Sequence, residues 1–417
     1  MEEDSKKPVL VVVGTTGVGK SNLAIEIAQK VDGEIINADS MQVYKGLDII
    51  TNKVSKEEQE AAKHHLLGFV EPTDEYSVLQ FEKDALDVIH DIHSRGKVPI
   101  LVGGTHYYIQ SILWDSHLDS EEQSLIGTTL ASLLARVDPI MAARWHPNDT
   151  RKIRRSLQVY YMTGTSHSEI LQKQKEDGGG ALRFRTGVFW LWAENAALDK
   201  RLDGRVDTMI QNGLFAEITS MREKMQPPDT LNVVPLDYTR GILQTIGFKE
   251  FDTYFTSPSP EAQRQGIEAM QAATRRYARK QVSWIRNKLA PKCLATPGMG
   301  FWALDATDLG GWSECVGALG VKIAREFLEG GSGTGAEAVT QRLVDTGGAR
   351  SAMQQQQEVD WAPRTCGVCV DAKSGQGRLI HGAREWAIHM KSNSHAKMVK
   401  RQRWKEERRL WEEKKRI

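Results

Sequence analysis

Short apolar runs alternate with longer amphipathic segments through the first part of the chain. The runs Val9–Val13 and Val98–Val102 are almost continuously apolar, which is typical of strands buried on both faces of a parallel sheet. Apolar residues at three- and four-residue spacing over Asn22–Ala28 and Tyr76–His93 predict helices between these strands. Strand character returns at Thr186–Trp192. This alternation predicts an α/β fold built on a parallel sheet.

The segment between the first strand and the first helix is rich in glycine and ends in lysine and serine. It has the spacing of a P-loop, and its residues are Gly14, Thr15, Thr16, Gly17, Val18, Gly19, Lys20 and Ser21. In such a loop the backbone N–H groups and the helix N-terminus face a phosphate. The lysine adds a positive charge, and the serine hydroxyl is a ligand for Mg²⁺. The sequence therefore predicts a site for a phosphorylated substrate with Mg²⁺, an ordinary glycine turn being the alternative.

Polar side chains follow two of the predicted strands. The short apolar run Gly33–Ser40 ends in Asp39 and Ser40, and Thr105 follows the third strand after two glycines. Ligands of open α/β sheets bind beyond the carboxyl ends of the strands, so Asp39 and Thr105 are expected beside the P-loop. A capping role for Asp39, or a role in holding Mg²⁺ through water, remains open. We interpret His64-His65 as a helical surface pair, because neighbours on a helix do not face one another.

Two helical segments concentrate positive charge. The first contains Arg151, Lys152, Ile153, Arg154 and Arg155, and it suits either a phosphate backbone or a solvated surface. In the second, Arg275, Arg276, Arg279 and Lys280 are interleaved with Tyr277 and Trp284. Basic residues among aromatic ones fit a nucleic-acid backbone with unstacked bases, although the two aromatics also fit the core of an amphipathic helix.

The last ninety residues have a different composition. A segment rich in glycine, serine and glutamine begins at Glu329, and such a composition predicts a flexible linker. Beyond it, Cys366 and Cys369 are two residues apart, and His389 and His395 follow at five. Two thiolates on a tight turn with two imidazoles from a following helix predict a closed tetrahedral Zn²⁺ site that a small module needs in order to fold.

Length and charge limit the remaining alternatives. With 417 residues the chain is expected to form several domains. We divide it into an α/β core over 1–114 and 185–328, a helical insertion over 115–184, a linker over 329–360 and a metal-binding tail over 361–417. Its net charge is +1, and four cysteines do not make a disulfide framework. Neither a leader peptide nor a membrane span is apparent. We expect a cytoplasmic protein, and mitochondrial or nuclear pools are also compatible with the sequence.

Several blocks together resemble one enzyme family. They are GTTGVGKS from Gly14, NADSMQVYKGLDIITNK from Asn37, GGTHYYIQ from Gly103, WHPNDTRKIRRSLQ from Trp145, RVDTMIQNGL from Arg205, GILQTIGFKEF from Gly241 and TRRYARKQVSWIRN from Thr274. In order and content they are similar to the tRNA dimethylallyltransferases, also called tRNA isopentenyltransferases. The tail resembles the zinc finger of eukaryotic members. The resemblance covers most of residues 8–305.

This resemblance implies a P-loop NTPase-like core that transfers a dimethylallyl group from dimethylallyl diphosphate to N6 of adenosine 37 in tRNA, releasing diphosphate. Asp39 would be the general base, Thr105 would hold the reactants, and Ser21 would carry Mg²⁺. The P-loop, with Gln244 and Lys249, would bind the diphosphate. The expected tRNA contacts are Asp39, Ser40, Met41, Gln42 and the run from Arg151 to Arg155. No obligate protein partner is implied. A small-molecule or nucleotide kinase, or an adenylate isopentenyltransferase, is the alternative.

Overall fold

The computed structural model describes residues 6–114, 130–145, 149–176, 182–225, 236–344, 363–370, 377–381 and 383–414. These residues form two compact units. One comprises Met1–Ser116 with Ala181–Met353, and the other His117–Gly180 with Gln354–Ile417. The first unit contains the predicted α/β core, and each unit is described by itself.

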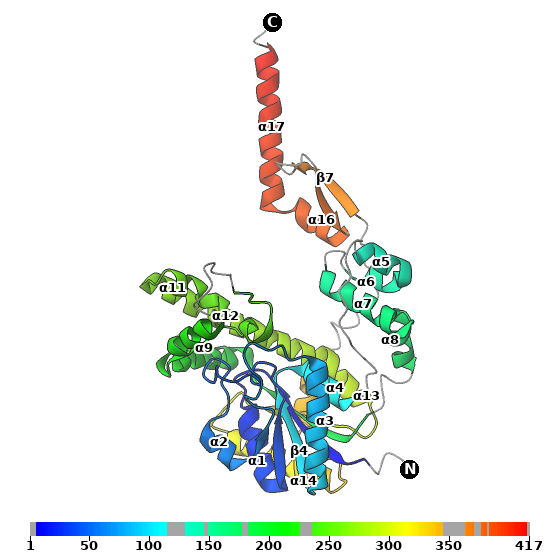
Figure 1. Ribbon diagram of the computed structural model, residues 1–417, viewed down its shortest axis with the longest axis vertical. Helices are drawn as coiled ribbons and strands as arrows, with labels where there is room; N and C mark the ends of the chain where they lie inside the picture. The colour runs from blue at the N-terminus through cyan, green and yellow to red at the C-terminus, as the bar shows by residue number, and fades with distance from the viewer. Residues whose placement is uncertain are drawn as a thin grey trace. The chain divides into compact units, whose positions relative to one another are not determined.

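A six-stranded parallel sheet is the centre of the first unit (Figure 1). Its strands are β1 (Pro8–Gly14), β2 (Gly33–Asn37), β3 (His64–His65), β4 (Val98–Gly103), β5 (Arg185–Trp192) and β6 (Gly300–Asp305). Their order is β3-β2-β4-β1-β5-β6, so β1 lies between β4 and β5. The predicted parallel sheet is confirmed. Because the connections run in opposite directions from β1, a crevice is expected beyond its carboxyl end, where the P-loop begins.

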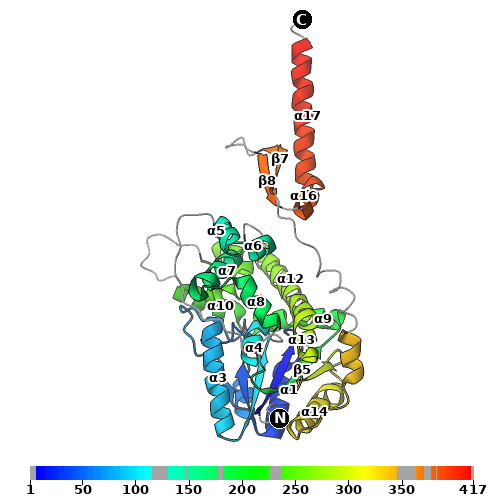
Figure 2. The same cartoon turned by 90° about the vertical axis from the view of Figure 1, so that its right-hand side faces the viewer.

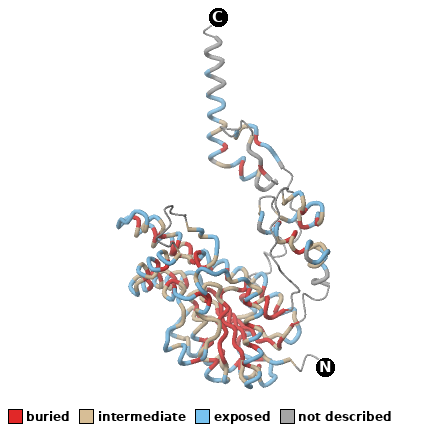
Figure 3. The backbone as a smooth tube through the Cα atoms, in the orientation of Figure 1, coloured by how far each residue is buried: buried red, intermediate tan, exposed pale blue. Residues whose placement is uncertain are grey.

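Side chains alternate between the two faces of the sheet. Val9, Val11 and Val13 pack into one core, together with residues of α3 (Val78–Ser94), α4 (His106–Leu113) and α13 (Ala290–Ala295). Leu10 and Val12 pack into the other, with α1 (Lys20–Val31) and α14 (Leu319–Leu328). All five β1 side chains are fully buried, and Figure 3 shows buried residues concentrated on the strands. Each such side chain contributes roughly 1.5–3 kcal/mol of hydrophobic stabilisation.

A third core of the same unit is mainly helical. It joins residues of the segment 41–50 to helices and short turns that come much later in the chain. These are α9 (Asn195–Gln211), α10 (Leu214–Met225), η2 (Gly241–Gln244), η3 (Lys249–Phe251), α11 (Asp252–Thr256) and α12 (Pro260–Trp284). Ser259 begins α12 by accepting a hydrogen bond from Ala262 N at 3.1 Å, with Pro260 at the first helical position. A π-helical turn, η4 (Ile285–Leu289), continues α12 directly.

The predicted linker, 329–360, starts within the folded core rather than after it. Trp302 Nε1 donates to the Gly333 carbonyl at 2.9 Å, and Ala303 N donates to Thr340 Oγ1, also at 2.9 Å. Ala336 and Leu343 are buried against the sheet. Gly333, one of the glycines that suggested flexibility, instead lets the backbone lie close to the Trp302 ring. The stretch up to residue 344 therefore belongs to the core, while the rest of the predicted linker, from 345 to 360, lies outside the described residues.

The insertion of the second unit is helical, as its pattern predicts. Its helices are α5 (Leu130–Val137), α6 (Pro139–Arg144), α7 (Thr150–Thr163) and α8 (His167–Glu176). Leu134, Met141, Ile153 and Leu157 form a small core of their own. Buried Asp138 stabilises this core by accepting hydrogen bonds from Met141 N at 3.0 Å and Ser168 N at 2.8 Å.

The tail of the second unit is a hairpin followed by two helices. Strands β7 (Pro363–Val370) and β8 (Gly377–His381) are antiparallel, and α16 (Ala383–Met390) and the long α17 (Asn393–Lys414) follow (Figure 2). Across both units, the helices that the structure describes include none long and apolar enough to span a membrane. The smaller elements α2 (Lys56–Ala61) and η5 (Ser313–Ala318) belong to the first unit.

Candidate functional site

The P-loop presents an open helix N-terminus. Gly17 and Gly19 have φ values of 75° and 95°, a region that favours glycine. Gly19 is the N-cap of α1 and offers no side-chain cap, and the first turn of α1 has no acidic residue. The Trp312 ring also leaves no space for a side chain at Gly19. The first N–H groups of α1 are thus arranged for an anion.

Two partly buried cations lie near one carboxylate beside this loop. Lys20 Nζ donates to the Thr15 carbonyl at 2.7 Å. Burial lowers the pKa of Lys20 to about 8, against the opposing effect of Asp39, and Arg205 lowers it further. Burial likewise lowers the pKa of the Arg205 guanidinium to about 10, again opposed by Asp39. With two cations and one carboxylate, the cluster keeps an excess positive charge for an anionic ligand.

Arg205 is a site residue that the sequence reasoning missed. It lies on α9, in a segment so rich in charge that it resembles a solvated helix. Its block, RVDTMIQNGL, contributed to the family resemblance but was given no role. That block was the available signal, since an arginine within a block shared with the family is a natural ligand for phosphate.

Asp39, Ser40 and Thr105 are brought together as predicted. A side chain at Gly103 would collide with the Ala38 backbone, so the glycine lets the ends of β2 and β4 approach closely. Thr105 Oγ1 accepts from Ser40 N at 2.9 Å and donates to Ser40 Oγ at 3.1 Å. Asp39 Oδ1 accepts from Met41 N at 3.0 Å, which is the capping role left open by the sequence. Its other oxygen, Oδ2, lies beside Gly104. A Cβ atom placed on that glycine would be 3.6 Å from Oδ2.

Gln281 of α12 joins the two sides of this site, a role that is not predicted from the sequence. Its Oε1 accepts from Thr16 N at 2.9 Å, and its Nε2 donates to the Gly104 carbonyl at 3.0 Å. The side chain is buried. One glutamine therefore fixes the P-loop against the end of β4.

Two buried polar atoms near the P-loop lack a protein partner among the described residues. They are Thr15 Oγ1 and His106 Nε2. The His106 ring stacks on Trp284 with 4.9 Å between centroids, and burial, then Lys20, lowers its pKa to about 3. The imidazole is therefore neutral at physiological pH. Unsatisfied buried groups of this kind fit a polar ligand bound at the loop.

Three other residues that were predicted to bind the diphosphate or tRNA instead contact residues close to them in the chain. Gln244 donates to the Gly241 carbonyl at 3.3 Å, and Lys249 lies nearest Glu250. Both side chains are exposed, and neither interacts with the P-loop in the described structure, so the structure does not support them as diphosphate ligands. Gln42 Nε2 holds the carbonyls of Thr51 and Asn52, which fixes the shape of its loop.

The residues of the first basic run, 151–155, differ in their exposure within α7. Ile153 is buried in the core of the insertion, so its interpretation as a tRNA contact is wrong: it faces inward at the helical spacing of Leu157. Lys152 and Arg154 are exposed, and Lys152 pairs with Asp149 at 2.8 Å. Arg155 is partly exposed, and the side chain of Arg151 lies outside the described residues.

The second basic run also divides. Arg275 pairs with Asp203 of α9, and Arg279 with Asp199 at 2.6 Å. These two arginines hold α12 to α9. Arg276 and Lys280 are exposed, with no partner in the part of the chain that is described.

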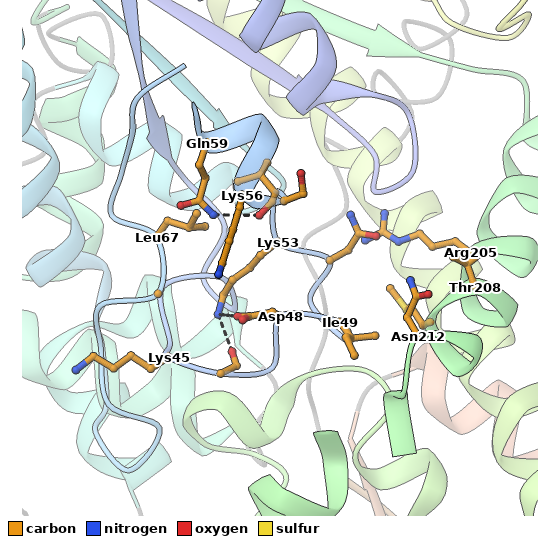
Figure 4. A pocket seen from close by; sticks show the side chains of 16 residues that line it. Lys45, Asp48, Ile49, Lys53, Lys56, Gln59, Leu67, Arg205, Thr208 and Asn212 are labelled. Carbon is orange, nitrogen blue, oxygen red and sulfur yellow. Dashed lines mark hydrogen bonds and ion pairs between the residues drawn. The ribbon is translucent and has the colours of Figure 1, made fainter. Parts of the chain in front are cut away.

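A pocket of about 520 Å³ lies between the segment 45–68 and α9 (Figure 4). Lys45, Lys56 and Arg205 line it, so it is rich in positive charge. Lys53 is fixed by the carbonyls of Tyr44 and Gly46 and by Asp48, each at 2.6 Å. Because Arg205 also faces Asp39, the pocket adjoins the P-loop cluster. Its volume is in the range of small-molecule sites.

The predicted metal ligands of the tail converge. One ligand atom from each of Cys366, Cys369, His389 and His395 lies within 4.8 Å of the others. His395 Nδ1 is 3.6 Å from Cys366 Sγ and 3.5 Å from Cys369 Sγ. Zn–S and Zn–N bonds at a tetrahedral angle place sulfur and nitrogen ~3.5 Å apart. The donor set and its spacing therefore fit Zn²⁺.

Comparisons with known proteins agree with this site. The IPP transferase family profile matches residues 42–288. The chain is 38% identical over 434 residues to a tRNA dimethylallyltransferase of Schizosaccharomyces pombe, covering 97% of this chain and 98% of the relative. For the Homo sapiens tRNA dimethylallyltransferase the values are 39%, 95% and 86%. A crystal structure of a eukaryotic dimethylallyltransferase acting on tRNA is 36% identical, with a TM-score of 0.80, and covers 97% of this chain and 100% of that chain.

Proposed function

Because the chain belongs to the tRNA dimethylallyltransferase family, we propose that it transfers a dimethylallyl group from dimethylallyl diphosphate to N6 of adenosine 37 in tRNA, releasing diphosphate. The observation that carries the proposal is the cluster of partly buried Lys20 and Arg205 near Asp39, beside the open N-terminus of α1 in the P-loop. It offers positive charge to a diphosphate and a carboxylate to a proton in one place.

The residues divide the reaction between them. The N6 nitrogen attacks the terminal allyl carbon, the bond from that carbon to oxygen breaks, and its electron pair leaves on the diphosphate. The N–H groups of the P-loop, Lys20 and Arg205 stabilise this developing negative charge. Ser21 would hold Mg²⁺, which supplies further charge neutralisation when bound. Asp39 accepts the proton from N6. Thr105 holds Ser40, and through it the turn that carries Asp39.

We also propose that the tail binds Zn²⁺ and contacts tRNA. The tetrahedral donor set supports the metal. Helix α17 continues from His395 with Lys397, Lys400, Arg401 and Arg403, whose positive charge suits phosphate groups. Arg276, Lys280 and the exposed basic residues of α7 are the proposed contacts within the core and the insertion.

Mass spectrometry of tRNA incubated with the protein, dimethylallyl diphosphate and Mg²⁺ tests the activity. A dimethylallyl mass on one anticodon-loop adenosine is expected. Phosphoryl transfer from ATP to an acceptor, with no tRNA modification, would instead identify a kinase. Modification of free adenosine phosphate but not of tRNA would identify an adenylate isopentenyltransferase.

The variant Asp39→Asn tests the role of the carboxylate. The amide has nearly the same shape but cannot accept the proton. Single-turnover transfer is expected to fall about 10²- to 10⁴-fold, with diphosphate affinity little changed. Thr105→Ser, which keeps the hydroxyl, is the matched control. Near-normal transfer by Asp39→Asn, or a loss explained by diphosphate affinity alone, would remove Asp39 from the catalytic role.

A further inference from the structure

Tyr277 lies on α12 one helical turn before Gln281, so the two side chains share a face of that helix. Gln281 contacts the Gly104 backbone, and Asp39 Oδ2 faces the same glycine. The position of Tyr277 is therefore at the edge of the site that contains the carboxylate.

The surroundings of Tyr277 differ from those of the core aromatics. Its side chain is 37% exposed, whereas Phe81 and Phe248 are 0% exposed. Among the described residues no ring stacks on Tyr277 and no cation lies over it. Tyr277 is therefore not fully covered by its own chain, and a ligand can reach it.

The phenol of the same side chain lies near the carboxylate. Burial and the nearby Asp39 carboxylate raise the pKa of the Tyr277 phenol, and the neighbouring Gln281 side chain opposes the rise. The phenol is therefore neutral. Arg276 and Lys280 lie beside it on α12 and are exposed, so positive charge flanks the ring.

A base that is modified in a nucleic acid must leave its stack, and aromatic side chains commonly replace the lost stacking. We propose that the ring of Tyr277 stacks on the acceptor adenine and replaces the stacking that the base loses when it leaves the anticodon loop. This inference rests on the proposed transfer to tRNA. Tyr277 is a substrate-binding residue in this account, and the flanking Arg276 and Lys280 hold the adjoining phosphates.

Steady-state transfer by the full-length protein tests the assignment, with tRNA varied at saturating dimethylallyl diphosphate. Tyr277→Phe keeps the ring, and its kcat/KM for tRNA is expected within about threefold of the wild type. Tyr277→Leu keeps apolar volume but loses the π face. Its kcat/KM is expected to fall roughly ten- to a hundredfold, through a higher KM for tRNA with kcat nearly retained. Pyrophosphate affinity and Tm should match the wild type in both variants.

The outcomes distinguish a failure of the proposed function from a failure of the stacking role of Tyr277. An inactive wild-type protein would refute the proposed function itself. With an active wild type, equal activity of Tyr277→Leu would overturn the stacking role. So would a Phe variant as impaired as the Leu variant, since that result assigns the effect to the hydroxyl. A loss confined to kcat, or one that follows a lowered Tm, would also overturn it.

Discussion

Gln281→Leu is expected to destabilise the site, because it removes two hydrogen bonds that join the P-loop to the end of β4. The glutamine makes two hydrogen bonds, at 2.9 and 3.0 Å, and only 4% of it is exposed. Leucine fills most of the same volume, but it leaves the Thr16 N–H and the Gly104 carbonyl without their partner. Each orphaned group costs about 1–3 kcal/mol, so the two together are expected to destabilise the protein by about 2–6 kcal/mol. For a unit of this size that corresponds to a Tm lower by roughly 4–24 °C.

Thermal unfolding and pyrophosphate titration on one preparation measure the effect. Gln265→Leu on the exposed face of α12 is the matched control, and it should change Tm by less than about 2 °C. Gln281→Glu keeps the acceptor for Thr16 N–H but places a negative charge beside the diphosphate site. It should therefore weaken pyrophosphate binding more than Gln281→Leu does. If Gln281→Leu behaved like Gln265→Leu, the two hydrogen bonds would not be what holds the P-loop to β4.

The charged groups of the core and the metal-binding tail each lead to a further testable expectation. Lys20 binds an anion only when protonated and its pKa is about 8, so pyrophosphate affinity should be nearly constant below pH 8 and weaken above it. Lys20→Arg should flatten that profile in a calorimetric titration, and a flat wild-type profile would contradict the reasoning. Arg95, with a smaller contribution from His65, lowers the pKa of buried Glu34 to about 2. The ionised Glu34 side chain therefore stabilises the folded protein fully above about pH 4.5, and this contribution to the free energy of unfolding is lost as pH falls towards 2. Glu34→Gln should therefore cost up to about 3 kcal/mol near neutral pH by denaturant unfolding, whereas exposed Glu60→Gln should not. Zinc chelation, or truncation after Val344, should weaken tRNA binding and its salt dependence without changing pyrophosphate affinity; an unchanged salt slope would argue against phosphate contacts by the tail.

Strands β1, β2, β4 and β5 and the P-loop could be predicted because their signals are local, whereas the edge strands β3 and β6 were missed. A continuous apolar run such as Val9–Val13 has few alternatives once a glycine loop and a helix follow it. The metal ligands were equally accessible, because two cysteines and two histidines at the right spacing need no knowledge of the fold. His64-His65 shows the limit of this reasoning. The pair forms the edge strand β3 rather than a helix, because its backbone pairs with β2 and His65 reaches the buried Glu34 at 2.7 Å.

The positive charge of α12 shows why the rest of the site needed the structure. By sequence Arg275, Arg276, Arg279 and Lys280 are equivalent, yet Asp203 and Asp199 of α9 pair with the first and third of them. The two acids are four residues apart, as are the two arginines, and they pair in reverse order, which is the register of antiparallel helices. That match is visible in the sequence, but only to a reader who already knows that α9 packs on α12. The role of Gln281 is still harder to predict from the sequence, because its partner Thr16 is 265 residues away. Tertiary packing thus assigns half of the basic run to holding the helix and leaves Arg276 and Lys280, beside Tyr277, exposed, which is why they are the residues proposed to contact tRNA.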